Sequence, residues 1–363
     1  MKVATVRIVP LQPLMFRGPG EFDPSSRGVF SHVTSLPIPR PSTLVGMLIT
    51  AHLQMIPSSV ITKRIKNWHE LLQQYMEIFN ILGIKAIRGP YLCLSVGEVK
   101  EILLPIRLGK VLKFAKISEI TIELIRETIE ALFESKLHNL LGRIRTLLIL
   151  DKIAEEIGEK VIIPIQRIGI ALRDRSPVEI SKTAMEGFIY ETQLTAYEKN
   201  IEIRFKLILD ESNKVIKNKW LAVKVGGEQK VAKMIITDEK DEYDKRLRQV
   251  NFKYAILLSP VPLLRVNDAK SVEYVGEIDV IGMGFSMVMR RRKPIYPALL
   301  EGSIIRIQAK KKINIDLLQE YGIYYMLGLI SDFKVSQTNE NEKRFNEYEI
   351  LGKLGYGTIL PLF

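Results

Sequence analysis

The pattern of apolar and polar residues predicts one strand and two helices in the first quarter of the chain. Residues 2–10 are rich in β-branched side chains and predict an opening strand. Residues 42–55 and 64–82 carry apolar side chains at helical spacing, so each run predicts a helix with one buried face. Gly83 follows the second run and is predicted to end that helix.

A β-rich region and then a helical insertion are predicted next. Residues 84–108 predict three strands separated by two turns, a tight basic corner at 88–90 and a hairpin turn at 96–98. From residue 118 to about 160 the apolar spacing becomes helical, which predicts a helical pair inserted between β segments. Its cations are balanced by carboxylates, so we interpret it as a solvated, partner-docking face rather than an RNA groove.

The second half of the chain returns to β patterns. Residues 201–209 alternate apolar with polar or charged side chains and predict a half-buried strand. The polar tract 210–219 is a candidate domain junction or exposed hairpin tip. Residues 221–236 predict a strand, a double-glycine turn and a further strand or helix start, and residues 348–363 form a glycine-rich tail.

Composition adds a strongly basic character to this α+β pattern. The chain has 363 residues, 47% of them hydrophobic, and no apolar run approaches the roughly 20 residues of a membrane span. The first ten residues have no signal-peptide layout, and the single cysteine, Cys93, is typical of a reducing compartment, so a cytoplasmic location is expected. The formal net charge of +12 favours a polyanionic partner, with nucleic acid as the leading class.

The long stretch between the opening strand and the first predicted helix is the first candidate site. Arg17, Arg27 and Arg40 lie among small residues, a composition typical of surfaces that approach phosphates. Ser42 or Thr43 offers a helix N-cap beside Arg40, and free N–H groups at a helix start can bind an anion. An ordinary capped helix after an irregular loop is the alternative interpretation.

Two further features favour phosphate or base contacts. Arg290, Arg291, Arg292 and Lys293 are contiguous, and four neighbouring cations repel one another unless an anion neutralises them, although a flexible charged loop would also fit. In the tail, Gly352, Gly355 and Gly357 free the backbone for a close approach, and Tyr356 offers a stacking face.

The sequence gives little support for catalysis or for a bound metal or cofactor. It has no phosphate-binding loop lysine, no dinucleotide fingerprint and no nucleophile elbow, and its four histidines are scattered. Only His32 is placed where a general base could act on RNA, and a loop histidine that contacts the backbone is the simpler interpretation. No catalytic residue and no cofactor are predicted.

The order and spacing of several landmarks resemble a known superfamily. The landmarks are PLMFRGPGEFD, PIPRPSTLVGML, IRGPYL, IQRIGIALRDR with EGFIY, VKVGGEQKVA, LLSPVPLL and GKLGYGTILPLF. Together they resemble the repeat-associated mysterious protein (RAMP) superfamily of CRISPR systems. Within it, the chain is similar to the Cas5-like subunits that cap the 5′ repeat-derived tag of the guide RNA in type III-B (Cmr) effector complexes. The resemblance spans nearly the whole chain, except the helical insertion.

This resemblance implies a fold and a function. The fold class is α+β, with two ferredoxin-like (RRM-like) domains over 1–210 and 211–363, the helical insertion, and a C-terminal glycine-rich loop over 352–357. The function implied is that of a non-catalytic, RNA-binding subunit of a ribonucleoprotein in antiviral defence. Its partners would be the crRNA 5′ tag, the large polymerase-like subunit, the adjacent backbone RAMP subunit and, indirectly, target RNA, with no membrane. A thumb hairpin that displaces a guide nucleotide would lie at 96–110 or 167–190.

The candidate RNA-binding residues combine this resemblance with the basic run, which the family does not clearly predict. They are Arg17, Gly18, Arg40, Ser42, Thr43, Arg88, Arg167, Lys224, Lys230, Arg290, Arg291, Arg292, Lys293, Gly355, Tyr356 and Gly357. Two other functions compete with guide binding. One is a metal-independent RAMP endoribonuclease that processes repeat RNA through His32, and the other is a protein-only scaffold. The equivalent type III-A subunit is a near neighbour.

Overall fold

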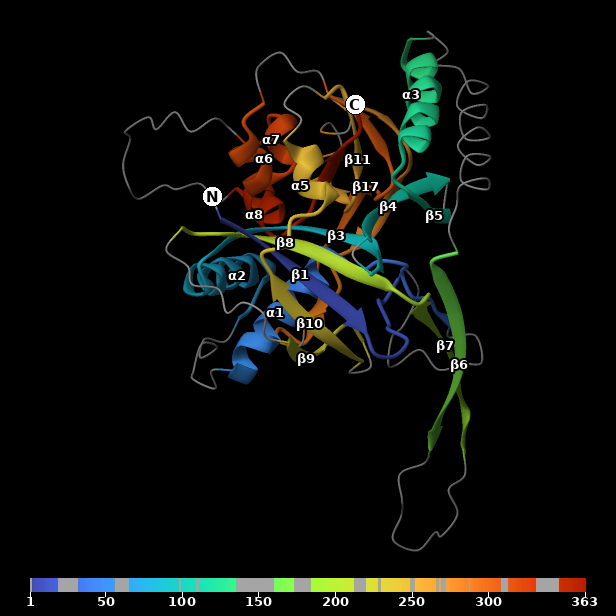
Figure 1. Ribbon diagram of the computed structural model, residues 1–363. Coiled ribbons are helices and arrows are strands. Elements are labelled where there is room, and N and C mark those ends of the chain that lie inside the picture. The colour runs from blue at the N-terminus through green and yellow to red at the C-terminus, as the bar shows by residue number, and fades with distance from the viewer. Residues whose placement is uncertain are drawn as a thin grey trace, which may run out of the picture.

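A seven-stranded antiparallel sheet forms the centre of the computed structural model (Figure 1). The structure describes residues 2–18, 32–55, 65–97, 99–108, 111–134, 160–172, 184–211, 220–227, 230–248, 252–265, 268, 272–286, 288–307, 313–330 and 346–363. The strand order of the sheet is β5-β4-β3-β8-β1-β10-β9. Its strands are β1 (Lys2–Pro10), β3 (Ile84–Val96), β4 (Val99–Leu108), β5 (Val111–Lys116), β8 (Ile201–Leu209), β9 (Trp220–Lys224) and β10 (Val231–Thr237).

Helices cover both faces of this sheet. On one face lie α1 (Pro41–Met55) and α2 (Trp68–Leu82), which connect β1 to β3. On the other face lie α5 (Glu242–Leu247), α6 (Ile315–Tyr321), α7 (Ile323–Met326) and α8 (Glu347–Lys353) (Figure 1). Since β1 and β3 both pair antiparallel with β8, they run parallel to each other with β8 between them. The central strands are therefore shielded from solvent on two sides.

The two predicted helices of the first quarter are confirmed. The Asn67 side chain accepts a hydrogen bond from the Glu70 N–H at 2.9 Å and caps the start of α2. Gly83 ends α2 in the left-handed conformation, with φ of 62°. Helix α1 differs in one detail, because it begins at Pro41, a position whose fixed φ suits the first turn. Ser42 and Thr43 therefore lie inside the first turn and are not N-caps.

The predicted basic corner at 88–90 is wrong. β3 runs through this region as one strand, and a bulge between Arg88 and Tyr91 absorbs the cis Gly89–Pro90 bond. A bulge displaces the local backbone but keeps the strand in the sheet. The sequence pattern of such a bulge cannot be distinguished from that of a turn. The hairpin turn that follows is confirmed, since Val96 pairs with Val99 and Gly97 has φ of 58°.

The half-buried strand predicted at 201–209 is a strand, but β8 is buried along its whole length. Its cations pair with carboxylates at the start of α5 and with Glu202 on β8 itself. The Lys206 ammonium lies 3.0 Å from Asp241 and 2.6 Å from Asp244, and Arg204 pairs with Glu202 at 2.9 Å. These partners neutralise charges that alternation alone predicts to be solvated.

The second half of the chain forms smaller sheets. A four-stranded sheet has the order β13-β18-β11-β19, and a three-stranded sheet the order β12-β17-β14. Their strands, with a two-stranded pair β15-β16, are β11 (Tyr254–Leu257), β12 (Val261–Pro262), β13 (Glu273–Val275), β14 (Ile278–Gly282), β15 (Phe285–Ser286), β16 (Arg291–Arg292), β17 (Ile295–Leu299), β18 (Ile304–Arg306) and β19 (Ile359–Pro361).

The predicted division of the chain at residue 210 does not match the sheets. β9 and β10 follow this position, yet β10 pairs with β1 through Val6 and Ile236, so both belong to the seven-stranded sheet. Strands of the smaller sheets begin only with β11. The structure confirms an α+β chain with antiparallel sheets, and the two ferredoxin-like domains stay a prediction.

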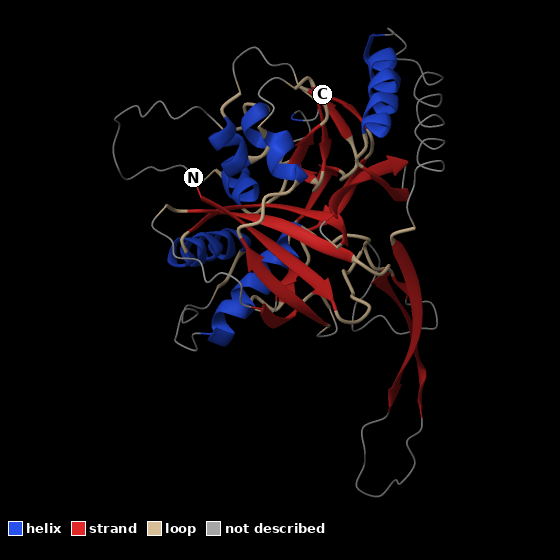
Figure 2. Cartoon of the chain, viewed as in Figure 1, coloured by secondary structure: helices blue, strands red, loops and turns tan. Residues whose placement is uncertain are grey.

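A two-stranded arm projects from the body of the molecule. It consists of β6 (Ile162–Leu172) and β7 (Ala184–Tyr197), and the short β2 (His32–Val33) pairs in parallel with β7 (Figures 1 and 2). The expected helical insertion begins with α3 (Glu119–Glu134), and residues 135–159 lie outside the described residues. Of the two thumb candidates, 96–110 belongs largely to the β3–β4 hairpin of the central sheet, whereas 167–190 lies in the projecting arm.

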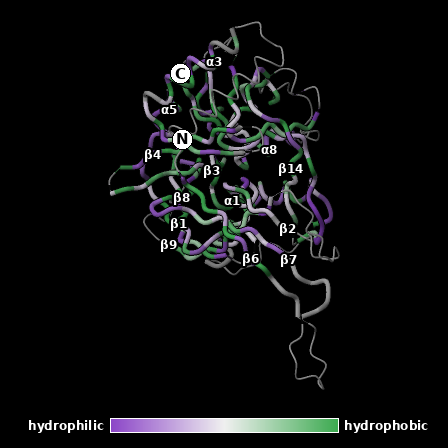
Figure 3. Tube along the Cα trace, turned by 90° about the vertical axis from the view of Figure 1, so that its right-hand side faces the viewer, coloured by the Kyte–Doolittle hydropathy of each residue, from purple (hydrophilic) through white to green (hydrophobic). Residues whose placement is uncertain are grey.

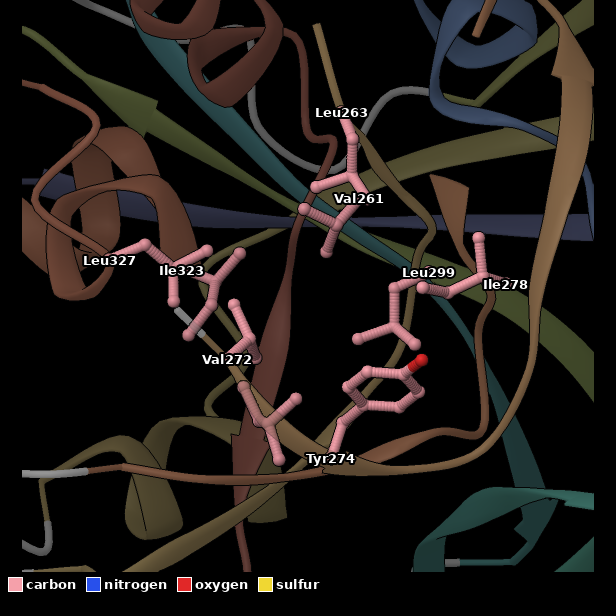
Figure 4. Close-up of a pocket in the computed structure, with 9 residues that line it drawn as sticks. Val261, Leu263, Val272, Tyr274, Ile278, Leu299, Ile323 and Leu327 are labelled. Carbon is pink, nitrogen blue, oxygen red and sulfur yellow. The ribbon is translucent and has the colours of Figure 1, made fainter. Parts of the chain in front are cut away.

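The interior of the molecule is apolar and tightly filled. Hydrophobic stretches run through β3 and β8, as Figure 3 shows. A small void between the sheets of the second half has a volume of about 10 Å³ and is lined by apolar side chains such as Val261, Leu299 and Ile323 (Figure 4). A void of this size is at the limit for a single water and holds no ligand. No helix in the described parts of the chain is long and apolar enough to cross a membrane.

Candidate nucleic-acid interface

The first predicted loop and the double-glycine turn meet in the structure. The Gly227 N–H donates to the Met15 carbonyl at 2.8 Å, so this turn lies directly on the segment that carries Arg17 and Gly18. Gly226 has φ of 74°, and a Cβ at that position would lie 2.2 Å from the Met15 carbonyl oxygen. Only glycine allows this approach. Residues more than 200 positions apart in sequence are thus neighbours because the turn lacks a side chain.

The chain then returns along the same segment on its way to α1. The Leu36 N–H donates to the Phe16 carbonyl at 2.6 Å, and the Gly18 N–H donates to the Thr34 carbonyl at 2.9 Å. A Cβ on Gly18 would lie 2.8 Å from the Thr34 hydroxyl, so the two strands of this pairing are in close contact. The Thr195 hydroxyl, at the base of the β6–β7 arm, donates to the Leu36 carbonyl at 2.9 Å. The arm is thereby joined to the segment that returns toward α1.

The start of α1 holds two buried polar groups whose hydrogen-bonding capacity is unused among the described residues. They are the Nη1 atom of Arg40 and the hydroxyl of Tyr356, a residue that is completely buried. Ser42 approaches the phenol oxygen, but no described group completes a well-formed hydrogen bond with it. Burial raises the pKa of Tyr356, while Ser42 and the Arg40 cation oppose that rise. Buried donors of this kind usually have a partner, so the pair is consistent with a ligand that completes the site.

Lys293 adds a cation to the same neighbourhood from the second half of the chain. Its ammonium donates to the Tyr75 hydroxyl at 3.2 Å and lies 5.9 Å and 5.6 Å from the ring centres of Trp68 and Tyr75. Burial lowers the pKa of Lys293 to about 8. Burial raises the pKa of Tyr75, and the nearby Tyr356 adds to this rise, so the tyrosine that receives the lysine lies in the neighbourhood of Tyr356.

These groups form an electropositive, donor-rich site, which we call the α1 cluster: Arg40, Ser42, Tyr75, Lys293 and Tyr356. Helix α1 has no acidic residue in its first turn, so nothing in that turn offsets the positive end of its dipole. A phosphate could accept hydrogen bonds from the Arg40 guanidinium and from the helix N–H groups. The site offers no paired acid and base, and the described residues contain no group of three or more metal-ligating side chains.

The remaining predicted site residues are distributed around this cluster. Arg17 is exposed beside the double-glycine turn, Lys224 is exposed at the end of β9, and Lys230 is buried next to it. Arg167 is exposed on the arm, and its backbone pairs with Thr192, which itself pairs with Val33. Thr43 lies in the first turn of α1. Arg27 falls outside the described residues.

The structure gives Arg88 an internal role instead of an RNA contact. Its side chain is 1% exposed, and its guanidinium donates to the carbonyls of Gln319 at 2.6 Å and of Gly352 at 2.7 Å. The unusual burial lowers the pKa of Arg88 to about 10. Arg88 therefore joins β3 to α6 and α8, and its guanidinium faces away from solvent.

The glycine-rich tail is also internal. Gly355 packs against the β3 bulge, where a Cβ would lie 3.3 Å from the Gly89 carbonyl oxygen. The Ser259 hydroxyl donates to the Gly355 carbonyl at 2.7 Å, and the Gly89 N–H donates to the Thr358 hydroxyl at 3.0 Å. Gly357 is buried, with φ of 68°. These glycines permit close packing between the two halves of the chain, and Tyr356 is too deeply buried to stack on a base.

The four residues of the basic run 290–293 do not share one environment in the structure. Lys293 turns inward to the α1 cluster, whereas Arg290, Arg291 and Arg292 are exposed. Sequence reasoning missed the two aromatic residues that receive the lysine, Trp68 and Tyr75. Both occur at helical spacing on α2, which is equally typical of residues that pack in a core.

Comparisons with known proteins show what this chain is similar to. Residues 6–142 match the family model described as CRISPR-associated protein (Cas_Cmr3). The chain is 28% identical over 334 residues to the CRISPR system CMR subunit Cmr3 of Saccharolobus solfataricus, covering 89% of this chain and 93% of that protein. The chain is thus similar to Cmr3 over most of its length.

Solved structures extend the similarity over almost the whole fold. A chain of the type III-B Cmr-beta complex bound to cognate target RNA, determined by cryo-electron microscopy, is 25% identical and has a TM-score of 0.63. The match covers 99% of this chain and 96% of that chain. The structure of the same complex with target RNA and AMPPnP gives a TM-score of 0.63 at 23% identity, with the same coverage. The described fold is thus that of a chain from a type III-B Cmr complex.

Proposed function

We propose that this chain is a non-catalytic subunit of a type III-B Cmr complex and that it binds the 5′ repeat-derived tag of the guide RNA at the α1 cluster. The observation that carries this proposal is the pair of unused buried donors, Arg40 Nη1 and the Tyr356 hydroxyl, at an electropositive helix start. A backbone phosphate would satisfy the arginine, the helix N–H groups and the nearby Lys293 charge together.

Cations around the cluster would extend the contact along the RNA. Arg17 and Lys224 are exposed near the double-glycine turn, and Arg167 is exposed on the arm whose base is bonded to residues 14 and 36. Such a series of cations suits a single strand that leaves the cluster, because each contact neutralises one phosphate. The projecting β6–β7 arm is then the better thumb candidate, since it extends from the body beside the proposed path.

The other proposed roles are protein contacts. In a Cmr complex the chain would dock the large polymerase-like subunit and the adjacent backbone RAMP subunit, and it would meet target RNA only indirectly. The similarity to a chain of a complex bound to cognate target RNA supports a role in such an assembly. Cleavage would belong to other subunits, because the α1 cluster offers donors and cations but no paired general acid and base.

The test is binding of purified chain to a guide RNA with and without its 5′ tag, across a salt series and with EDTA present. Wild-type protein is expected to bind tagged RNA more tightly. Arg40→Gln should weaken that binding about tenfold or more and reduce the log–log salt slope by about 0.7, the value for one phosphate of a single strand. The matched control is Arg265→Gln, which removes the same charge from an exposed position and should leave both quantities unchanged.

Two results would contradict this function. Equal affinity of wild-type protein for tagged and untagged RNA would leave a basic scaffold without tag recognition. RNA shortened during incubation with EDTA, and left intact by His32→Ala, would favour the endoribonuclease.

A further inference from the structure

One long two-stranded ribbon connects the three-stranded sheet, through β14 and β17, to the pair β15-β16. β14 pairs with β17 from Ile278 opposite Leu299 to Gly282 opposite Ile295. The Met283 N–H donates to the Pro294 carbonyl at 3.0 Å, and β15 and β16 continue in the same register to Ser286 opposite Arg291. The ribbon therefore spans 278–286 and 291–299 without a register shift and ends in a short turn.

The outer face of this ribbon is apolar and exposed. Val280 is 59% exposed, Ile295 is 69% exposed, and Ile278 is 37% exposed. Val280 lies opposite Pro297 and Ile295 opposite Gly282, so the valine and the isoleucine are diagonal neighbours on one face. Gly282 leaves the space across from Ile295 without a side chain. By strand alternation Phe285, which is 50% exposed, lies on the opposite face of the ribbon, and Val288 is 46% exposed in the turn. Neighbouring apolar side chains at this exposure mark an interaction site more often than isolated ones do.

The backbone of the ribbon is also open on one side, where the outward Val280 N–H donates to the Asp279 carboxylate at 2.7 Å and must exchange this partner for an incoming strand. β14 is the last strand of its sheet, and within the described residues no strand pairs with its outer edge. Asp279 is its only charged residue, and the strand has no lysine, proline or bulge of the kind that blocks pairing at exposed edges. An extended segment could therefore add to β14 through main-chain hydrogen bonds and place its apolar side chains beside Val280.

Charge at the turn restricts the class of occupant. Arg290, Arg291 and Arg292 are exposed, and their side chains form no ion pair with the described part of the chain. Three adjacent cations favour an anionic partner. RNA would satisfy the arginines and could stack on Phe285 opposite Arg292, but the aliphatic face of Ile278, Val280 and Ile295 offers it neither stacking nor hydrogen bonds. A protein segment with apolar residues followed by carboxylates would satisfy both parts of the surface.

We infer that the ribbon is a docking site for another protein subunit, which adds an extended apolar segment to the edge of β14 and places carboxylates against Arg290–Arg292. This inference rests on the proposed function only in that the chain works inside a multi-subunit Cmr complex. It gives the molecule two binding surfaces, one for RNA at the α1 cluster and one for protein at the outer edge of the ribbon, and Lys293 of the ribbon belongs to the first of these.

The first test measures assembly of the purified chain with the purified large subunit and with the purified backbone subunit, one at a time, by sedimentation. Val280→Asp should weaken binding to one of them at least tenfold. The control is Val99→Asp, because Val99 is equally exposed, at 59%, on the distant β3–β4 hairpin, and it should assemble as wild type does. Tagged-RNA affinity should be unchanged in both variants, so a failure of this inference is distinct from a failure of tag binding.

The second test does not depend on a disruptive charge. The only native cysteine, Cys93, is completely buried, so Val280→Cys can be labelled selectively with an environment-sensitive fluorophore. Its emission should shift to the blue on addition of the binding subunit, and the same label at Val99→Cys should not respond.

Three outcomes would overturn the inference. The first is normal assembly of Val280→Asp with both subunits. The second is a Val280-dependent dimer of the chain alone, which would make the occupant a second copy. The third is a loss of RNA affinity without a loss of subunit affinity in the Arg290→Glu, Arg292→Glu double variant, which would assign the arginines to RNA.

Discussion

Replacement of Gly226 by alanine provides a direct test of the contact between the double-glycine turn and the first loop. A left-handed φ costs a non-glycine residue roughly 1–2 kcal/mol. In addition, the new Cβ would lie 2.2 Å from the Met15 carbonyl oxygen, whereas real Cβ contacts are essentially never below 3.0 Å. The turn must move away, which breaks the Gly227–Met15 hydrogen bond, itself worth about 1 kcal/mol. With some loss of packing around buried Met15, we expect a total of about 2–4 kcal/mol.

The assay is urea unfolding of Gly226→Ala beside Gly97→Ala. Gly97 also has a positive φ, of 58°, but a Cβ added there would meet no atom within 4 Å, so this control isolates the cost of the backbone conformation. Gly97→Ala should lose only about 1 kcal/mol. Gly226→Ala should also bind tagged RNA more weakly, because Arg17 and Gly18 would move with the displaced loop. Equal free energies of unfolding for the two variants would refute the close contact on which this reasoning depends.

Two further predictions concern buried cations. Lowering the pKa of Lys293 from 10.5 to about 8 corresponds to a cost of up to about 3 kcal/mol. Between those pH values the unfolded chain binds more protons than the folded one, so the stability of the wild type rises with pH. Lys293→Met should therefore be more stable than wild type at pH 7 by up to that amount and equally stable near pH 10.5. If chemical unfolding gave the same difference in stability between the two proteins at every pH, this effect would be excluded. Lys206→Met should lose about 3–5 kcal/mol, because it leaves Asp241 and Asp244 buried without their cation, whereas exposed Lys240→Met should stay within about 0.5 kcal/mol of wild type in the same unfolding assay.

Elements set by local sequence were predicted well. Helix α2 has a polar cap at Asn67 and a glycine at its end, and both signals act within a few residues of the helix. The same holds for the turn at Gly97 and for the two strands around the double glycine. The bulge at Arg88 was missed because its cause is distant: Gly355 and Thr358, more than 260 residues later, pack against it.

The candidate site shows the same division. Arg40 and Ser42 could be selected from the sequence, since a cation before a helix start is a local signal. The partners that complete the cluster, Tyr356 and Lys293, come from the other end of the chain. The sequence placed both among residues that contact RNA directly, whereas the structure holds the tyrosine inside and the lysine between two aromatic rings.

The net charge of +12 is a weaker guide to the partner than it first suggests, because several cations are used inside the protein. Arg88, Arg204 and Lys206 are almost completely buried, each held by carbonyls or carboxylates. The alternating pattern of β8 is the same whether its polar face meets water or a row of carboxylates. In this chain the distinguishing residues, Asp241 and Asp244, lie more than thirty positions away. The cations that indicate RNA binding are therefore those, such as Arg40, that form no ion pair with any described carboxylate, and the sum of charges does not identify them.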